Sequence, residues 1–206
     1  MLKNFDEFME YSREMRDVVG AWGFNSNLNF AAMAPEESNV WFFEQVFNFL
    51  RAFFGLVVPD KLELITYNAT QHIKRSGLDQ QTFLDELMLI MKGLKEPLWT
   101  FKLGLNIIGF LKTTHQKDMP TRLQIQEPCH FIAWGGPDET GFQNFSISYH
   151  LFSTLRLEDQ DQELWSLNQP LLEKGLKKWE TQSGHRIEVV DSTGNVPVHT
   201  YGFGRK

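Results

Sequence analysis

The sequence is poor in cysteine and proline, and it has no excess of positive charge. Its 206 residues include a single cysteine, Cys129, which excludes an internal disulfide and any zinc site built from several cysteines. Lys and Arg total 20 against 26 Asp and Glu, and the formal net charge of −6 argues against nucleic acid as a partner. The 8 prolines and 15 glycines are typical of an ordinary globular chain rather than a disordered one.

Long apolar runs are also missing. The longest apolar segment, 41–54, is interrupted by four polar residues, Glu44, Gln45, Asn48 and Arg51, so it does not have the pattern of a membrane span. The first seven residues turn acidic at once and lack the basic flank and apolar run of a secretion signal. Together with the lone cysteine, these features predict a cytoplasmic protein that binds no membrane.

Aromatic side chains are abundant, with 18 Phe and 6 Trp, and they gather in one segment. Pro35 and the acidic residues after it predict the start of a helix. At 100° per residue, its apolar side chains fall within an arc of roughly 160°. This stripe contains Trp41, Phe42, Phe43, Val46, Phe47, Phe49, Leu50, Phe53 and Phe54. Because burial of one such side chain is worth roughly 1.5–3 kcal/mol, we expect something to cover the stripe.

Residues 1–96 have the apolar spacing of four helices. The first carries Phe5, Phe8, Met9, Met15 and Val19 on one side and ends before Gly20 or Gly23. The Phe-rich helix is the second, and the third extends from Pro59 to Gly77. The fourth carries Phe83, Leu84, Leu87, Ile90, Met91 and Leu94 on one side and stops before Pro97.

After Pro97 the apolar period changes from 3.6 to 2, which predicts strands over about 99–107, 122–134 and 143–152. The turn-rich loop 135–141 joins the last two into a hairpin. Centring this hairpin near Asp138 pairs Phe131 with Phe145, Cys129 with Ile147, and Ile125 with Leu151. A fifth helix over about 164–179, with Pro170 inside it, and two short strands over 185–191 and 196–203 complete the prediction.

These assignments predict an α+β protein. An N-terminal helical half of about four helices, residues 1–96, packs on an antiparallel half, residues 97–206, with β-β-β-α-β-β order. Because the connection through Glu96 and Pro97 is short, we expect the two halves to form one compact unit.

Histidines and serines supply the candidate catalytic groups. The six histidines have no metal-ligand spacing, so neither a metal site nor a cofactor is predicted. The predicted hairpin places His130 opposite Ser146, as a base and nucleophile would be, with His150 four residues further along. No Gly-x-Ser-x-Gly elbow, orienting carboxylate or oxyanion hole accompanies them, and we favour a protein that is not an enzyme. A hydrolase-like enzyme centred on this polar hairpin face is the first alternative.

His72 lies at the edge of the apolar stripe of the predicted third helix, where a histidine can be an axial haem ligand. The predicted order of elements is similar in topology to haem-based gas sensors. Those sensors carry a Tyr-x-Ser-x-Arg motif, whereas the nearest stretch here, Tyr149 to Arg156, has a different spacing, and no family is assigned. A haem or chromophore sensor that uses His72 is the second alternative.

The leading hypothesis is a binding or interaction protein without catalysis, which uses the Phe-rich helix and the apolar surface between the halves. The stripe would be covered by the sheet of the second half, by a second copy of the chain, or by a small apolar ligand. The partner is then another protein, the chain itself or that ligand. The candidate contact residues are Phe42, Phe43, Phe47, Phe49, Phe53 and Phe54.

Overall fold

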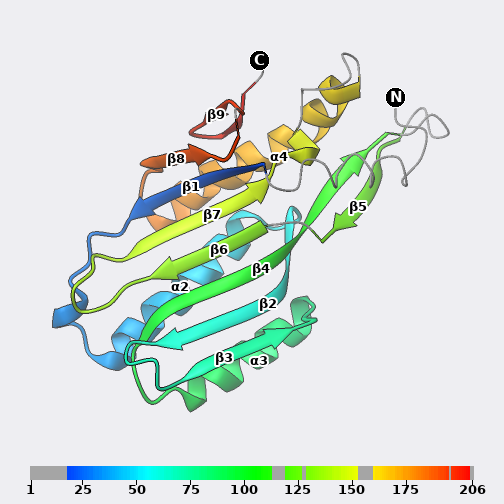
Figure 1. Cartoon of the computed structure of the whole chain (residues 1–206). Coiled ribbons are helices and arrows are strands. Elements are labelled where there is room, and N and C mark those ends of the chain that lie inside the picture. Colours follow the sequence, from blue (N-terminus) through cyan, green and yellow to red (C-terminus); the bar gives the residue numbers. More distant parts are fainter. Residues whose placement is uncertain (1–17, 113–118, 127–128, 153–159, 195, 205–206) are drawn as a thin grey trace.

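A broad antiparallel sheet dominates the computed structural model, which describes residues 18–112, 119–126, 129–152, 160–194 and 196–204 (Figure 1). The strands are β1 (Val19–Asn25), β2 (Val57–Thr66), β3 (His72–Ser76), β4 (Leu98–Leu111), β5 (Thr121–Ile125), β6 (Cys129–Trp134), β7 (Phe142–Ser148) and β8 (Val189–Ser192). Their order is β3-β2-β4-β6-β7-β1-β8, and β5 pairs with β4 beside this path. Two short strands, β9 (Val198–His199) and β10 (Gly202–Phe203), form a separate hairpin.

In the part of the chain that the structure describes, three α-helices lie on one side of the sheet (Figure 1): α2 (Pro35–Ala52), α3 (Gln80–Gly93) and α4 (Gln160–Ser183). Two short 3-10 helices, η1 (Phe30–Ala32) and η2 (His150–Phe152), connect elements. We call the side of the sheet beneath the α-helices the covered face and the other side the open face. In β6 the side chains of Cys129, Phe131 and Ala133 are buried and alternate with half-buried neighbours, as expected when only one face of a sheet is covered.

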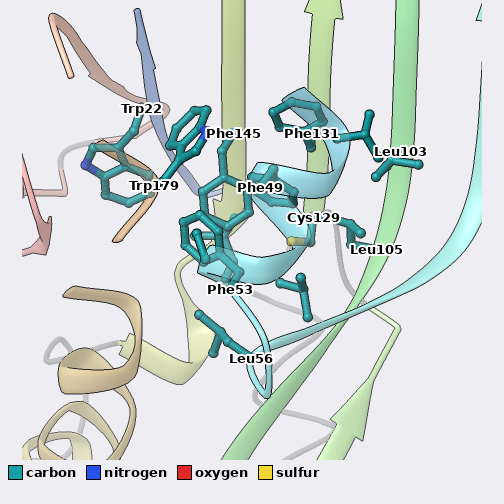
Figure 2. Close-up of a cluster of buried hydrophobic side chains, with 14 of the residues drawn as sticks. Trp22, Phe49, Phe53, Leu56, Leu103, Leu105, Cys129, Phe131, Phe145 and Trp179 are labelled. Carbon is teal, nitrogen blue, oxygen red and sulfur yellow. The ribbon is translucent and has the colours of Figure 1, made fainter. Parts of the chain in front are cut away.

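The core between the sheet and the helices is built from aromatic rings (Figure 2). Phe49 of α2 stacks on Phe131 of β6 with ring centroids 4.3 Å apart. Trp179 of α4 meets Phe49 edge-on at 5.8 Å, and Phe145 lies 4.5 Å from Phe53. Such pairs stabilise a core beyond the area they bury. The covered face therefore accounts for much of the aromatic excess in the sequence.

The predicted fold, with about four N-terminal helices packed on a C-terminal sheet, is wrong. Residues 59–77, predicted as the third helix, form most of β2 and all of β3. Leu62 and Leu64 are buried and alternate with Lys61 and Glu63, so buried positions recur every two residues, as in a strand. β2 pairs with β3 on one side and with β4 on the other, and this pairing outweighs the helical spacing of a few apolar residues.

The predicted first helix lies mostly outside the described residues, and its described end, from Val19 onward, is strand β1. β1 pairs with β7 and β8 in the same sheet. A Cβ atom on Gly20 would lie 2.6 Å from a ring carbon of Phe203, and one on Gly23 would lie 2.6 Å from the backbone oxygen of Gln143. These glycines therefore allow other residues to pack closely against strand β1, and they do not mark the end of a helix.

Several other predictions are confirmed. The second, fourth and fifth predicted helices correspond to α2, α3 and α4, and the strand after Pro97 is β4. The hairpin register is confirmed for Cys129 with Ile147 and for Phe131 with Phe145. The predicted pair of Ile125 with Leu151 is wrong, because the strand breaks into β5 and β6 and Ile125 pairs with Ile107 of β4.

Candidate functional site

The six phenylalanines of the predicted contact set fall into two groups. Phe42, Phe43, Phe49 and Phe53 are buried, whereas Phe47 is 37% exposed and Phe54 is 77% exposed. Within the described residues, the sheet and α4 thus cover most of the stripe. The two exposed rings both line a groove at the C-terminal end of α2.

This groove, which we call the α2–α3 groove, has a volume of about 450 Å³. Phe47, Leu50 and Phe54 line it from α2 and the residues just after it, and Val58 and Leu84 line it from β2 and α3. Its volume lies within the range of ligand-binding clefts, and its walls are mainly apolar. It is the place where the Phe-rich helix meets solvent.

Both helices carry further exposed apolar side chains outside the lining of the groove. We call the following six residues the apolar rim: Val40, Phe47 and Phe54, which recur every seven residues, and Leu84, Met88 and Met91 on α3. At 1.5 Å per helical residue, Val40 and Phe47 lie about 10 Å apart along α2, and Phe54 follows just after the helix ends at Ala52. Several large apolar side chains exposed around an apolar groove are typical of interaction sites.

Two arginines line the α2–α3 groove, Arg51 from α2 and Arg122 from β5. No Asp or Glu is among the lining residues, and neither arginine forms an ion pair with a side chain that the structure describes. The groove is therefore apolar with two available guanidinium groups, which bind carboxylates or phosphates through paired hydrogen bonds.

Sequence reasoning missed the apolar rim on α3 because it placed Leu84 and Met91 on the same side as Phe83 and Leu87. In the structure Phe83 and Leu87 are buried, whereas Leu84 and Met91 are 37% and 38% exposed. The signal was available in the spacing, since Leu84, Met88 and Met91 follow the i, i+4, i+7 pattern of a second apolar side.

The polar hairpin face has the predicted register, with His130 opposite Ser146 on the open face. Burial lowers the pKa of His130, and the nearby cations Lys102 and Lys61 lower this pKa further, against a hydrogen bond to the backbone of Leu103. The imidazole is therefore neutral at pH 7. His150 does not join this pair, because it is buried in η2 and its Nδ1 contacts the Ser148 hydroxyl.

His72, the candidate haem ligand, lies on the exposed edge strand β3 and not on a helix. Its Nε2 is 2.7 Å from Glu63 Oε1, and Lys74 Nζ lies 3.0 Å from the same carboxylate oxygen. Hydrogen bonds from His72 and Lys74 lower the pKa of Glu63. The structure thus places His72 in an exposed charged cluster, away from the aromatic core.

The described part of the chain contains no group of three or more His, Cys, Asp or Glu side chains that could hold a metal ion. Among the same residues, no helix combines the length and the apolar character needed to cross a bilayer. Comparisons with protein families, with curated proteins and with solved structures find no match for this chain.

Proposed function

We propose that this protein is a non-catalytic interaction module that binds an amphipathic helical segment of a partner protein in the α2–α3 groove. The observation that carries the proposal is Phe54, which is 77% exposed next to the buried Phe53 and lines an apolar groove. An exposed ring in such a place contributes nothing to the core, and burial against a partner would stabilise a complex.

The length of the apolar rim favours a helical segment over a small molecule. A ligand that fills only the cavity of about 450 Å³ would leave Val40, Met88 and Met91 exposed. A helix laid along the groove places side chains at i, i+4 and i+7 and covers about 11 Å in two turns. Methionines suit such a surface, because their flexible side chains adapt to different partner side chains.

Charge defines the partner further. Arg51 and Arg122 stand at the groove without carboxylates beside them in its lining. A partner helix that carries Asp or Glu next to its apolar side would pair with these guanidinium groups, which orients the helix and speeds association. The proposed partner segment is therefore apolar on one side and acidic at the edge that meets the arginines.

A selection from a library of displayed helical peptides tests this proposal. Peptides selected on the wild-type protein should share apolar residues at i, i+4 and i+7 with acidic residues beside them. Their affinity, measured by fluorescence anisotropy, should fall at least about tenfold for Phe54→Ser, the range of a lost anchor residue. Val189→Ser, which removes a 37% exposed apolar side chain from β8, away from the groove, is the control and should change little.

Two outcomes would overturn the proposal. One is a set of selected peptides that bind Phe54→Ser as tightly as wild type. The other is a wild-type dimer, seen by light scattering, that Phe54→Ser converts to a monomer, because this result assigns the groove to a second copy of the chain.

A further inference from the structure

A second hollow, distinct from the α2–α3 groove, lies on the open face and is lined by residues of β2, β3, β4 and β6. Figure 1 shows these four strands side by side. Its volume is about 340 Å³, and it shares no lining residue with the groove. The strand register explains why it forms. Lys61 of β2 and His130 of β6 both lie opposite Gly104 of β4. Because neighbouring strands are about 4.8 Å apart, the missing side chain at Gly104 leaves a gap between the two longer ones.

Positive charge surrounds this gap, although the whole chain carries a net charge of −6. Three lysines, Lys61, Lys74 and Lys102, and one carboxylate, Glu63, line the hollow from the open face. A cleft that gathers charge of one sign concentrates ions of the opposite sign.

One of the three lysines is already paired and two are available. Lys74 pairs with Glu63 at 3.0 Å, whereas Arg75, opposite the buried Leu62, pairs with Glu86 of α3 at 2.9 Å on the covered face. Lys61 and Lys102 form no ion pair with any residue in the described ranges. The charges of both lysines lower the pKa of His130, which lies opposite Gly104 in the sheet.

We infer that the hollow over Gly104 binds a small phosphate-bearing molecule, held by the ammonium groups of Lys61 and Lys102. A phosphate offers several oxygens at tetrahedral angles, so it can accept hydrogen bonds from lysines that approach from two different strands. His130 also lines the hollow, and its imidazole, with a lowered pKa, adds no positive charge of its own at pH 7. A hollow with a glycine floor suits a small group better than the broad surface of an acidic protein.

Gly104 also provides a way to fill the site. A Cβ atom there would lie 3.1 Å from the Cβ of Lys61, so a larger side chain would displace the Lys61 stem. Gly104→Val therefore fills the floor, whereas Lys61→Gln and Lys102→Gln remove the charges with little change in volume. Lys95→Gln is the matched control, because it removes one exposed positive charge from a residue that does not line the hollow.

Calorimetric titration of the full chain with inorganic pyrophosphate at low salt tests the inference. We expect saturable 1:1 binding that weakens about tenfold in Lys61→Gln and in Lys102→Gln, and that is lost in Gly104→Val. Lys95→Gln and Phe54→Ser should bind like wild type, and Phe54→Ser separates this site from the peptide groove. Thermal unfolding of each variant confirms that it is folded.

Three results would overturn the inference. The first is the absence of saturable pyrophosphate binding to the wild type. The second is an equal loss of affinity in Lys95→Gln and Lys102→Gln, and the third is tighter binding of hexaglutamate than of pyrophosphate. The second result means that general charge attraction explains the binding. The third assigns the hollow to an acidic protein surface.

Discussion

The two faces of the sheet use the same strands for different purposes. On the covered face, β6 places Phe131 at 0% exposure against Phe49 of α2. On the open face, the same strand places His130 and Ile132 half-buried, and His130 lines a charged hollow. Burial of rings thus stabilises the covered face. The hollow lies on the open face and the groove lies beside the helices, and each is lined by two cations that form no ion pair with the described residues. Variants matched across the two faces test this division.

The largest expected effect comes from neighbouring residues of β6 that point to opposite faces. Phe131→Ala leaves a cavity under α2 and should lower the free energy of unfolding by about 3–5 kcal/mol. Ile132→Ala removes a half-buried side chain from the open face and should cost about 1 kcal/mol. Urea unfolding measures both, and equal losses would show that the open face carries as much stability as the covered one.

The second largest effect on stability should come from substitution of Gly175, compared with Gly104. A Cβ atom on Gly175 of α4 would lie 2.5 Å from Cδ1 of Phe53, so Gly175→Ala should destabilise the fold by about 1–3 kcal/mol. The loss should occur although alanine is about 1 kcal/mol better than glycine within a helix. Gly104→Ala on the open face should change the free energy of unfolding by less than about 0.5 kcal/mol. Thermal unfolding of the two variants measures both changes. A Gly175→Ala variant as stable as wild type would refute the tight α2–α4 contact.

The change of stability with pH should be smaller than the effects of these substitutions, and we expect it to come from His130 on the open face. His130 has a lowered pKa in the folded chain, so below pH 6.5 the unfolded chain binds a proton that the folded chain does not. Stability should therefore fall as the pH decreases from 6.5 toward the folded pKa of His130. Urea midpoints at pH 7.5 and 5.5 should differ less in His130→Asn than in wild type, and an unchanged difference would contradict this assignment.

The smallest effect on stability should come from the apolar rim. Phe54→Ser alters an exposed ring and should change the free energy of unfolding by no more than about 0.5 kcal/mol. The adjacent Phe53→Ala, which empties a buried site, is the comparison and should cost several times more. A large loss in Phe54→Ser would place this ring in the core instead of at a partner surface.

Parts of the fold with strong local signals could be predicted from the sequence. α2 begins at Pro35 as expected, and the turn-rich loop around Asp138 set the hairpin register that pairs His130 with Ser146. Residues 59–77 could not be assigned in this way, because a few apolar residues fit both the helical period and the strand period. Pairing with β4, a strand distant in sequence, decided between them.

The candidate sites depend on such distant pairings and were largely invisible in the sequence. The exposure of Phe54 follows from where α2 ends and where α3 lies, and neither is encoded in the spacing of the stripe itself. Lys61 and His130 meet only because both lie opposite Gly104 in the sheet. A glycine within a strand pattern often marks a close approach or a binding position, and this was the one local signal of the hollow.

The central claim is that the α2–α3 groove binds a partner helix through the apolar and acidic sides of that helix. A double-mutant cycle tests this claim most directly. Calorimetry would measure a selected peptide and its Glu→Gln version against wild type and Arg51→Gln. The account predicts a coupling between the peptide carboxylate and Arg51 of at least about 1 kcal/mol. The account would be contradicted if the losses of binding free energy from Arg51→Gln and from Glu→Gln simply added at every acidic position of the peptide, and if Arg122→Gln gave the same result.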